Sequence, residues 1–290
     1  MSWQIVISAQ IIVSSLMTIC TRRLALTNRT LFFVVGVLTY GVIAVMGVIY
    51  SLAFGGGLPQ ILNHEAWPYL IGEGIAIPSS WLLQYKIISK LGASNAVLIT
   101  MLNNIGAASL GILLLNDDYT ATFFIGAVFI CLSIIIAFRV QPDTAHPQTV
   151  PLHTKLGLVS AMVVLFALGM YCEKQAITLI GVWNYSGYGW GLQFLGAFMV
   201  FLIFGRHELA SVTKSALRQG ILVGLLTSFA GGLYIYALSI GTLSHTIVAA
   251  SGKIALTGLL AAIFLHERNQ LRLRLAALLL SITGILFLVS

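Results

Sequence analysis

Long apolar runs alternate with short polar connections from one end of the chain to the other. A helix needs about 20 apolar residues to cross the hydrocarbon core of a bilayer. Ten runs meet this length, over 4–21, 31–53, 67–88, 94–115, 120–138, 156–174, 184–204, 217–238, 244–265 and 271–289. The connections leave no room for a water-soluble domain. The pattern therefore predicts an all-α polytopic membrane protein with ten transmembrane helices.

One connection, 139–155, is longer than the rest and holds three of the six prolines of the chain. Proline and polar residues end helices, so this segment is predicted to be a linker. It separates residues 1–138 from residues 156–290, with five predicted helices on each side. We expect these two segments to be two five-helix domains.

The two segments repeat one another at a shift of 150 residues. Leu91–Asp117 then falls on Gly241–Glu267 without a gap, and the polar residue in mid-helix is Asn103 in one copy and Lys253 in the other. An odd number of helices per copy places the second copy upside down in the membrane. Inverted repeats are common in transporters, whose substrate site lies at the repeat interface near the bilayer midplane. The sequence thus predicts a 5+5 inverted repeat with a site at that level.

Composition agrees with a membrane protein and excludes several other classes. Only 8% of residues are charged, against about 25% in soluble proteins, and the mean hydropathy is +0.99. The three cysteines and six histidines have no metal-ligand spacing, so we expect no metal and no disulfide framework. No nucleotide-binding loop is present, and no cluster of acids or histidines suggests a membrane enzyme. We expect neither enzymatic activity nor a cofactor.

Charge in the loops predicts the orientation. Loops after the odd-numbered helices carry most of the loop lysines and arginines, and loops on the other side are net acidic. The positive-inside rule then places both termini outside and the odd-numbered loops in the cytoplasm. Much of the net charge of +7 is thereby a topology signal, and we expect no nucleic-acid partner.

Two charged residues fall well inside apolar runs. Lys253 would lie about 13 Å from the start of its helix, where a charge costs at least a few kcal/mol and usually marks a site. It could bind an anionic substrate group or carry a proton. The structural alternative is an ion pair with Glu73 or a hydrogen bond to Asn103. For Glu73 the choice is between a proton relay and an interfacial carboxylate that reaches headgroup water.

Four polar or aromatic residues complete the main candidates. Asn103 and Asn104 point about 100° apart, so at most one faces a cavity squarely, and both could instead bond neighbouring helices. Trp190 and Gln193 share one face of the seventh helix and suit a pocket for an amphipathic molecule. The alternative there is an interfacial aromatic belt, which fits the nearby Tyr185 better than Trp190.

Gln84 and Tyr234 are equivalent under the shift of 150, and both could line a vestibule, although Tyr234 could equally anchor its helix at the interface. The expected partners are a small organic solute and the lipid bilayer, with protons as a candidate coupling ion. The chain could act as a monomer or as a homodimer.

Leu91–Thr100 with Leu113–Asp117 forms one stretch, and Leu243–Ala250 with Ile263–Glu267 forms its second copy. Both stretches resemble the fourth helix of EamA-type transporters of the drug/metabolite transporter superfamily. Ser281–Val289 resembles the last helix of that family. The resemblance covers essentially the whole chain. It implies a ten-helix metabolite transporter in a bacterial cytoplasmic (inner) membrane.

The sequence departs from this family at the centre of both repeats. Family members often carry Glu-Pro midway along the fourth and ninth helices, where this chain has Asn103-Asn104 and Lys253-Ile254. The family is also usually described with both termini in the cytoplasm, opposite to the loop charges. We expect secondary-active transport of amino-acid-like or other carboxylate- or phosphate-bearing solutes around Lys253. The alternative is proton-coupled export of cationic or hydrophobic drugs around Glu73.

Overall fold

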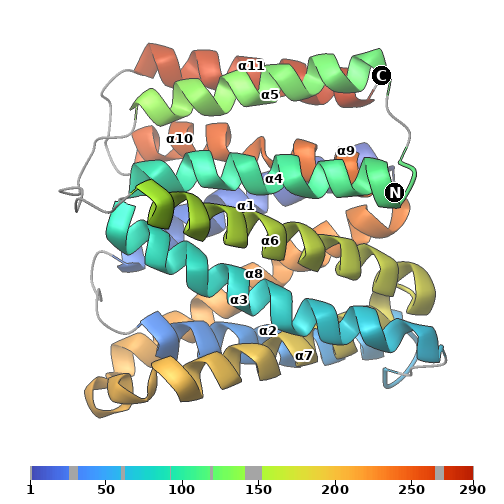
Figure 1. The fold of residues 1–290 in the computed structure, drawn as a ribbon, viewed down its shortest axis with the longest axis vertical. Coiled ribbons are helices and arrows are strands. Elements are labelled where there is room, and N and C mark those ends of the chain that lie inside the picture. The colour runs from blue at the N-terminus through green and yellow to red at the C-terminus, as the bar shows by residue number, and fades with distance from the viewer. Residues whose placement is uncertain are drawn as a thin grey trace.

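The computed structural model describes residues 2–25, 32–59, 63–91, 93–117, 120–140, 152–264 and 271–289. All regular elements within these ranges are helices, and the long helices from α2 to α7 alternate in direction along the chain (Figure 1). In chain order they are α1 (Trp3–Ala25), α2 (Phe32–Phe54), η1 (His64–Ala66), α3 (Trp67–Leu91), α4 (Ala93–Leu114), α5 (Ala121–Val140), α6 (Leu152–Ile180), α7 (Val182–Phe204), η2 (Arg206–Ser211), α8 (Lys214–Ile240), α9 (Leu243–Ala250), α10 (Lys253–Phe264) and α11 (Leu271–Val289).

The helices have the composition of membrane-spanning segments. Among the described residues, four are long and apolar enough to cross a bilayer: Phe33–Phe54, Leu156–Ile180, Val182–Phe204 and Lys214–Ile240. Parts of α1, α4, α5 and α11 form shorter apolar helices. Large apolar side chains such as Leu113 and Leu286 are 72% and 65% exposed, which a water-soluble surface would disfavour. The chain is an integral, multi-pass membrane protein.

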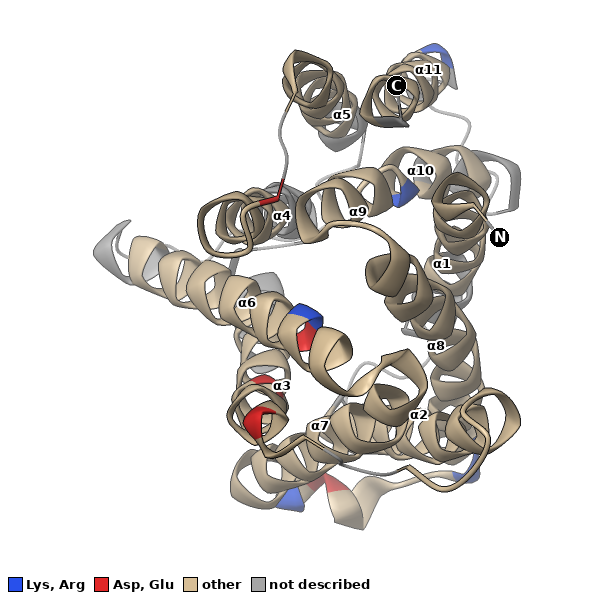
Figure 2. Cartoon of the chain, turned by 90° about the vertical axis from the view of Figure 1, so that its right-hand side faces the viewer, with Lys and Arg blue, Asp and Glu red and all other residues tan. Residues whose placement is uncertain are grey.

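The helices pack in pairs that correspond between the two halves of the chain. The contact between α3 and α6 corresponds to the contact between α8 and α1. The contact between α3 and α7 likewise corresponds to the contact between α8 and α2. α4 packs on α6 as α9 and α10 pack on α1, while α2 pairs with α7 and α5 pairs with α11. The α5–α11 pair forms one outer edge of the bundle, and both termini lie at one end (Figures 1 and 2).

Two predicted helices differ from the observed ones. The predicted helix 156–174 is α6, which continues to Ile180 because the residues after Lys174 are mostly apolar. Glu173 and Lys174, which end the predicted helix, are therefore well inside the observed one. The predicted helix 244–265 is interrupted at Ser251 and Gly252, and the two parts are α9 and α10.

Glycines bring several helices into backbone contact. Pro78 lacks an N–H, so the carbonyl of Gly74 loses its partner within α3. A side chain at Gly196 on α7 would collide with that carbonyl, and one at Gly47 on α2 would collide with the carbonyl of Ser186 on α7. Small residues at such positions allow close helix packing in membranes. α7 is thereby seated directly against α2 and α3.

Candidate functional site

Two buried carboxylates meet one tyrosine between α3, α6 and α7. Tyr185 is 0% exposed, and its hydroxyl lies within hydrogen-bonding distance of Oε1 of both Glu73 and Glu173, with 3.0 Å to Glu173. The amide of Gln193 also donates to Oε1 of Glu73. Glu73 and Glu173 are 0% and 4% exposed. We call these four residues the carboxylate cluster.

The structure therefore decides between the alternatives for two of these residues. Glu73 is fully buried, so the interpretation as an interfacial carboxylate in contact with headgroup water is wrong. Tyr185 lies in the interior rather than in an interfacial belt, because its hydroxyl finds its partners on α3 and α6. Glu73 and Gln193 were both candidates from the sequence, and the fold places them in contact.

Among the described residues, the groups that interact electrostatically with the carboxylate cluster carry no positive charge. Tyr40 on α2 interacts electrostatically with both carboxylates, Tyr234 on α8 with Glu173, and Cys172 on α6 with Glu73. No ion pair joins either glutamate to a cation within the part of the chain that the structure describes. An anion in a low-dielectric interior is costly unless it is paired, so this arrangement calls for a positive ligand.

Lys174 is adjacent to Glu173 in sequence but faces another partner. Its ammonium donates to the carbonyl oxygens of Leu238 and Gly241, at 2.6 and 2.7 Å, where α8 ends. A cation there satisfies free carbonyls and complements the helix dipole. Asp117, after α4, accepts from the backbone N–H of Ser244 at 2.8 Å, at the start of α9. The two side chains hold the α8–α9 turn from both sides.

Lys253 is the first residue of α10, directly after the interruption of the ninth predicted helix. It is partly exposed, and its carbonyl accepts from the hydroxyl of Ser15 on α1 at 3.1 Å. Among the described residues, no hydrogen bond or ion pair engages its ammonium. The structural alternatives, an ion pair with Glu73 or a hydrogen bond to Asn103, are thus wrong.

The two asparagines have different surroundings. Asn104 donates from Nδ2 to the hydroxyl of Ser251 at 2.6 Å, which links α4 to the interruption between α9 and α10. Asn103 is 4% exposed, and its Oδ1 has no hydrogen-bond partner among the described residues. Asn104 thus bonds a neighbouring helix, whereas Asn103 keeps an acceptor available.

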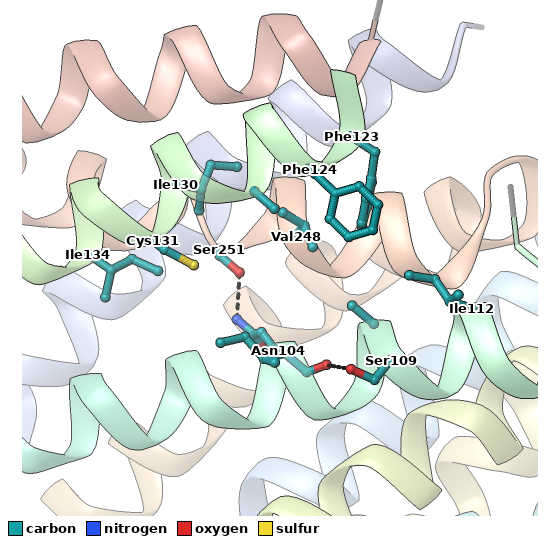
Figure 3. Close-up of a pocket in the computed structure, with 13 residues that line it drawn as sticks. Asn104, Ser109, Ile112, Phe123, Phe124, Ile130, Cys131, Ile134, Val248 and Ser251 are labelled. Atoms are coloured by element: carbon teal, nitrogen blue, oxygen red, sulfur yellow. Dashed lines mark hydrogen bonds between the residues drawn. The ribbon is translucent and has the colours of Figure 1, made fainter. Parts of the chain in front are cut away.

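A cavity of about 200 Å³ lies between α4, α5 and α9. Its lining is mostly apolar, and the Asn104–Ser251 hydrogen bond crosses it (Figure 3). Several lining side chains, including Phe124 and Ile105, are exposed at the apolar surface of the bundle. None of the carboxylate cluster lines this cavity, so it is a separate feature that opens towards the bilayer.

The remaining candidates do not belong to the carboxylate cluster itself. Trp190 is 4% exposed, and its ring centroid lies 5.9 Å from that of Tyr50 on α2. The hydroxyl of Tyr234 lies 3.5 Å from the sulfur of Met170 on α6. Gln84 is on α3, but its side chain lies outside the described residues. Within those residues, no group of three or more His, Cys, Asp or Glu is placed to hold a metal ion.

Sequence reasoning did not identify Glu173 as a site residue. The charged pair at 173–174 resembles the end of a membrane span, and we ended the predicted helix there. The apolar residues Ala176, Ile177, Leu179 and Ile180 were the available signal that the helix continues. The contact of Glu173 with Tyr185 depends on how α6 crosses α7, for which the sequence has no local pattern.

Comparisons with known proteins agree with this architecture. Residues 1–139 match the EamA-like transporter family. One solved crystal structure aligns over 99% of this chain and 96% of its own, with a TM-score of 0.78 and 12% sequence identity, so the likeness concerns the fold alone. Comparison with curated proteins gives no significant match.

An all-helical, multi-pass membrane bundle with polar groups in its interior agrees with a membrane transporter. The match over residues 1–139 supports membership of the drug/metabolite transporter superfamily, of the EamA type. Members of this family are transporters and not enzymes.

Proposed function

We propose that the protein is a secondary-active transporter of small organic solutes, and that amino-acid-like or other carboxylate- or phosphate-bearing molecules are its substrates. Transport proceeds by alternating access between two inverted five-helix halves in a bacterial cytoplasmic membrane. Protons are the candidate coupling ion.

The matched packing of the two halves supports the alternating-access part of this proposal. A five-helix unit at residues 1–138 and one at 156–290, related by a twofold axis in the membrane plane, would produce the corresponding helix pairs. In such repeats the substrate site lies where the halves meet, and discontinuous helices often form it. The interruption between α9 and α10 is a discontinuity of this kind.

The ammonium of Lys253, which has no partner among the described residues, is the observation that supports the proposed substrate class. It stands at the N-terminus of α10, where the helix dipole also favours a negative group. An unpaired cation at membrane depth is costly, and an anionic solute group would compensate it. Asn103, with its buried, unpaired amide oxygen, is the candidate second contact.

A second candidate function is proton-coupled export of cationic or hydrophobic drugs. It is favoured by the buried pair Glu73 and Glu173, which lies among the aromatic rings of Tyr40, Tyr185 and Tyr234. Carboxylates with aromatic neighbours attract organic cations through charge and cation–π contacts. In this function Lys253 would not touch the solute.

Uptake into proteoliposomes distinguishes the two candidates. We would screen amino acids, organic anions and organic cations with a pH gradient, comparing wild type with Lys253→Ala and Glu73→Gln. The control is Lys214→Ala, because Lys214 is an exposed lysine at the start of α8.

Under the first candidate function, Lys253→Ala abolishes uptake of carboxylate-bearing solutes and Lys214→Ala does not. If Lys253→Ala transports every accepted solute as well as wild type does, the anion site is refuted. Uptake of organic cations alone, lost in Glu73→Gln, would instead establish the second candidate. If no solute of any class is taken up, secondary transport itself is in question.

A further inference from the structure

The carboxylate cluster contains one buried oxygen without a partner. Oε2 of Glu73 is inaccessible to solvent, and no described residue donates a hydrogen bond to it. The other oxygen, Oε1, already faces the hydroxyl of Tyr185 and the amide of Gln193. If Glu73 were ionised, part of its negative charge would reside on an unsolvated, unpaired atom, which is the costliest arrangement of a buried carboxylate.

The single hydrogen of the Tyr185 hydroxyl also argues against two ionised glutamates. Its hydroxyl has a single hydrogen, yet its oxygen lies next to Oε1 of Glu73 and 3.0 Å from Oε1 of Glu173. If both glutamates were ionised, the hydrogen could reach only one of them. The lone pairs of the phenol oxygen would then face the other carboxylate, and this contact would be repulsive.

One added proton satisfies every contact. If Oε1 of Glu73 is protonated, it donates to the Tyr185 oxygen, and the Tyr185 hydroxyl donates to Glu173. Gln193 continues to donate to Glu73. Oε2 of Glu73 becomes a neutral carbonyl oxygen, for which the lack of a partner is much less costly. The negative charge that remains is on Glu173, the less deeply buried of the two acids.

We propose that Glu73, Tyr185 and Glu173 form the binding site of a single coupling proton, shared between α3, α6 and α7. The proton is held on Glu73 in this conformation. It leaves Glu73 when Glu73 passes it to the Tyr185 oxygen while Tyr185 passes its own hydrogen to Glu173. The proton is then held on Glu173. The number of protons is unchanged by the transfer, and Tyr185 stays a neutral phenol before and after it.

The surroundings favour a proton over a metal cation. The titratable groups that face the cluster from neighbouring elements are the phenols of Tyr40 and Tyr234 and the thiol of Cys172, and none carries a positive charge. A sodium or larger ion would need several oxygen ligands around a common centre. Here the described contacts instead join the oxygens one after another, from Glu73 to Tyr185 and from Tyr185 to Glu173.

The coupling role of this proton rests on the proposed transport function. The bound proton itself can be measured without transport. The probe is the infrared carbonyl-stretch band of a protonated carboxylic acid, recorded on the purified full-length protein in H₂O and D₂O at neutral pH. We expect wild type to show this band and Glu73→Gln to lack it. In Tyr185→Phe the band should remain but shift, because the protonated acid loses its acceptor.

Glu208→Gln is the matched control. Glu208 is also buried, at 5% exposure, but its Oε2 accepts a hydrogen bond from the backbone N–H of Val34 at 3.0 Å, unlike Oε2 of Glu73. This substitution should leave the band unchanged. A band that is absent from wild type, or that persists unaltered in Glu73→Gln, would overturn the proposal. Stabilisation of wild type by sodium without any such band would also overturn it.

Transport assays then test the role of this proton. For an accepted solute, Glu73→Gln and Tyr185→Phe should lose accumulation driven by a pH gradient but keep solute exchange without a gradient. Equal gradient-driven accumulation in wild type and both variants would refute coupling through this site. If the band behaves as expected while wild type transports nothing, the proton site stands and the proposed function fails.

Discussion

The ammonium of Lys174 on α6 lies 2.6 Å from the carbonyl oxygen of Leu238 on α8. The same ammonium donates to Gly241 three residues later, so one side chain satisfies two carbonyls at the end of α8. Asp117 interacts electrostatically with Lys174 and bonds the start of α9. These contacts connect α4, α6, α8 and α9 at the end of the bundle where both chain termini lie (Figure 2).

Replacing Lys174 should destabilise the protein. Lys174→Met keeps the apolar part of the side chain but removes two charge-assisted hydrogen bonds, for an expected loss of about 2 kcal/mol in the free energy of unfolding. Denaturant unfolding in detergent, followed by tryptophan fluorescence, measures this change. Lys214→Met serves as the control because Lys214 is exposed. Equal stability of the two variants would mean that the carbonyl contacts contribute nothing.

Two glycines on α7 should respond oppositely to alanine. A methyl group at Gly196 would collide with the carbonyl of Gly74, whereas one at Gly191 meets no atom within 4 Å. We expect Gly196→Ala to lower the free energy of unfolding by about 2 kcal/mol through overpacking. Gly191→Ala should be neutral or stabilising by up to about 1 kcal/mol, since alanine favours a helix over glycine. The same unfolding experiment compares them, and an undamaged Gly196→Ala protein would contradict the close approach of α3 and α7.

The hydrogen bond between Asn104 and Ser251 should appear as a coupling energy. Interhelical hydrogen bonds in membranes average about 0.6 kcal/mol in double-mutant cycles. We expect a value of that order for Asn104→Ala combined with Ser251→Ala, because the donor–acceptor distance is 2.6 Å. Additive single and double substitutions would show that the bond is not formed in the bilayer-like environment.

Replacing Asn103 should affect the stability of the protein and its transport function differently. Its buried Oδ1 is unpaired among the described residues, so Asn103→Leu removes a desolvation cost. The variant should unfold at the same denaturant concentration as wild type or a higher one. If Asn103 contacts the solute, the same variant should lose uptake. A less stable protein would show that the amide has a structural partner.

Cysteine labelling from outside intact cells should settle the orientation. η1 and η2 lie on opposite sides of the predicted membrane, and Glu65 and Arg206 on them are both exposed. With Cys20, Cys131 and Cys172 replaced, we expect an impermeant thiol reagent to label Glu65→Cys and not Arg206→Cys. The reverse pattern would place both termini in the cytoplasm, as the family is usually described, and would overrule the loop charges.

The long apolar runs predicted most helices of this protein, because a helix that crosses a bilayer requires such a run and the run is visible in the sequence. It failed where local composition is ambiguous. The charged pair at Glu173 and Lys174 suggested a helix end, and the interruption at Ser251-Gly252 has no proline to mark it. Both features depend on tertiary partners, namely Tyr185 for Glu173 and Asn104 for Ser251.

The candidate site was predicted only in part for the same reason. Burial of Glu73 and Gln193 could be expected from their positions in apolar helices, but their contact arises from the approach of α3 to α7. The alternative ion pair between Lys253 and Glu73 is not formed among the described residues, where Glu73 bonds Tyr185 and Gln193 instead. Pairing of two isolated charges is a reasonable guess from sequence, yet two charges can also each bind a separate ligand.

The backbone contacts at Gly47 and Gly196 bear on how the protein can move. They bring the backbones of α2, α3 and α7 into direct contact as one packed body, within which Tyr185 contacts Glu73. Glu173 belongs to α6, which borders that body and contacts it at Tyr185 over 3.0 Å. A shift of α6 away from α7 would break the hydrogen bond between Tyr185 and Glu173. A motion of α6 that opens the bundle would then also interrupt proton transfer from Glu73 to Glu173. This interruption would prevent protons from leaking across the membrane between transport cycles.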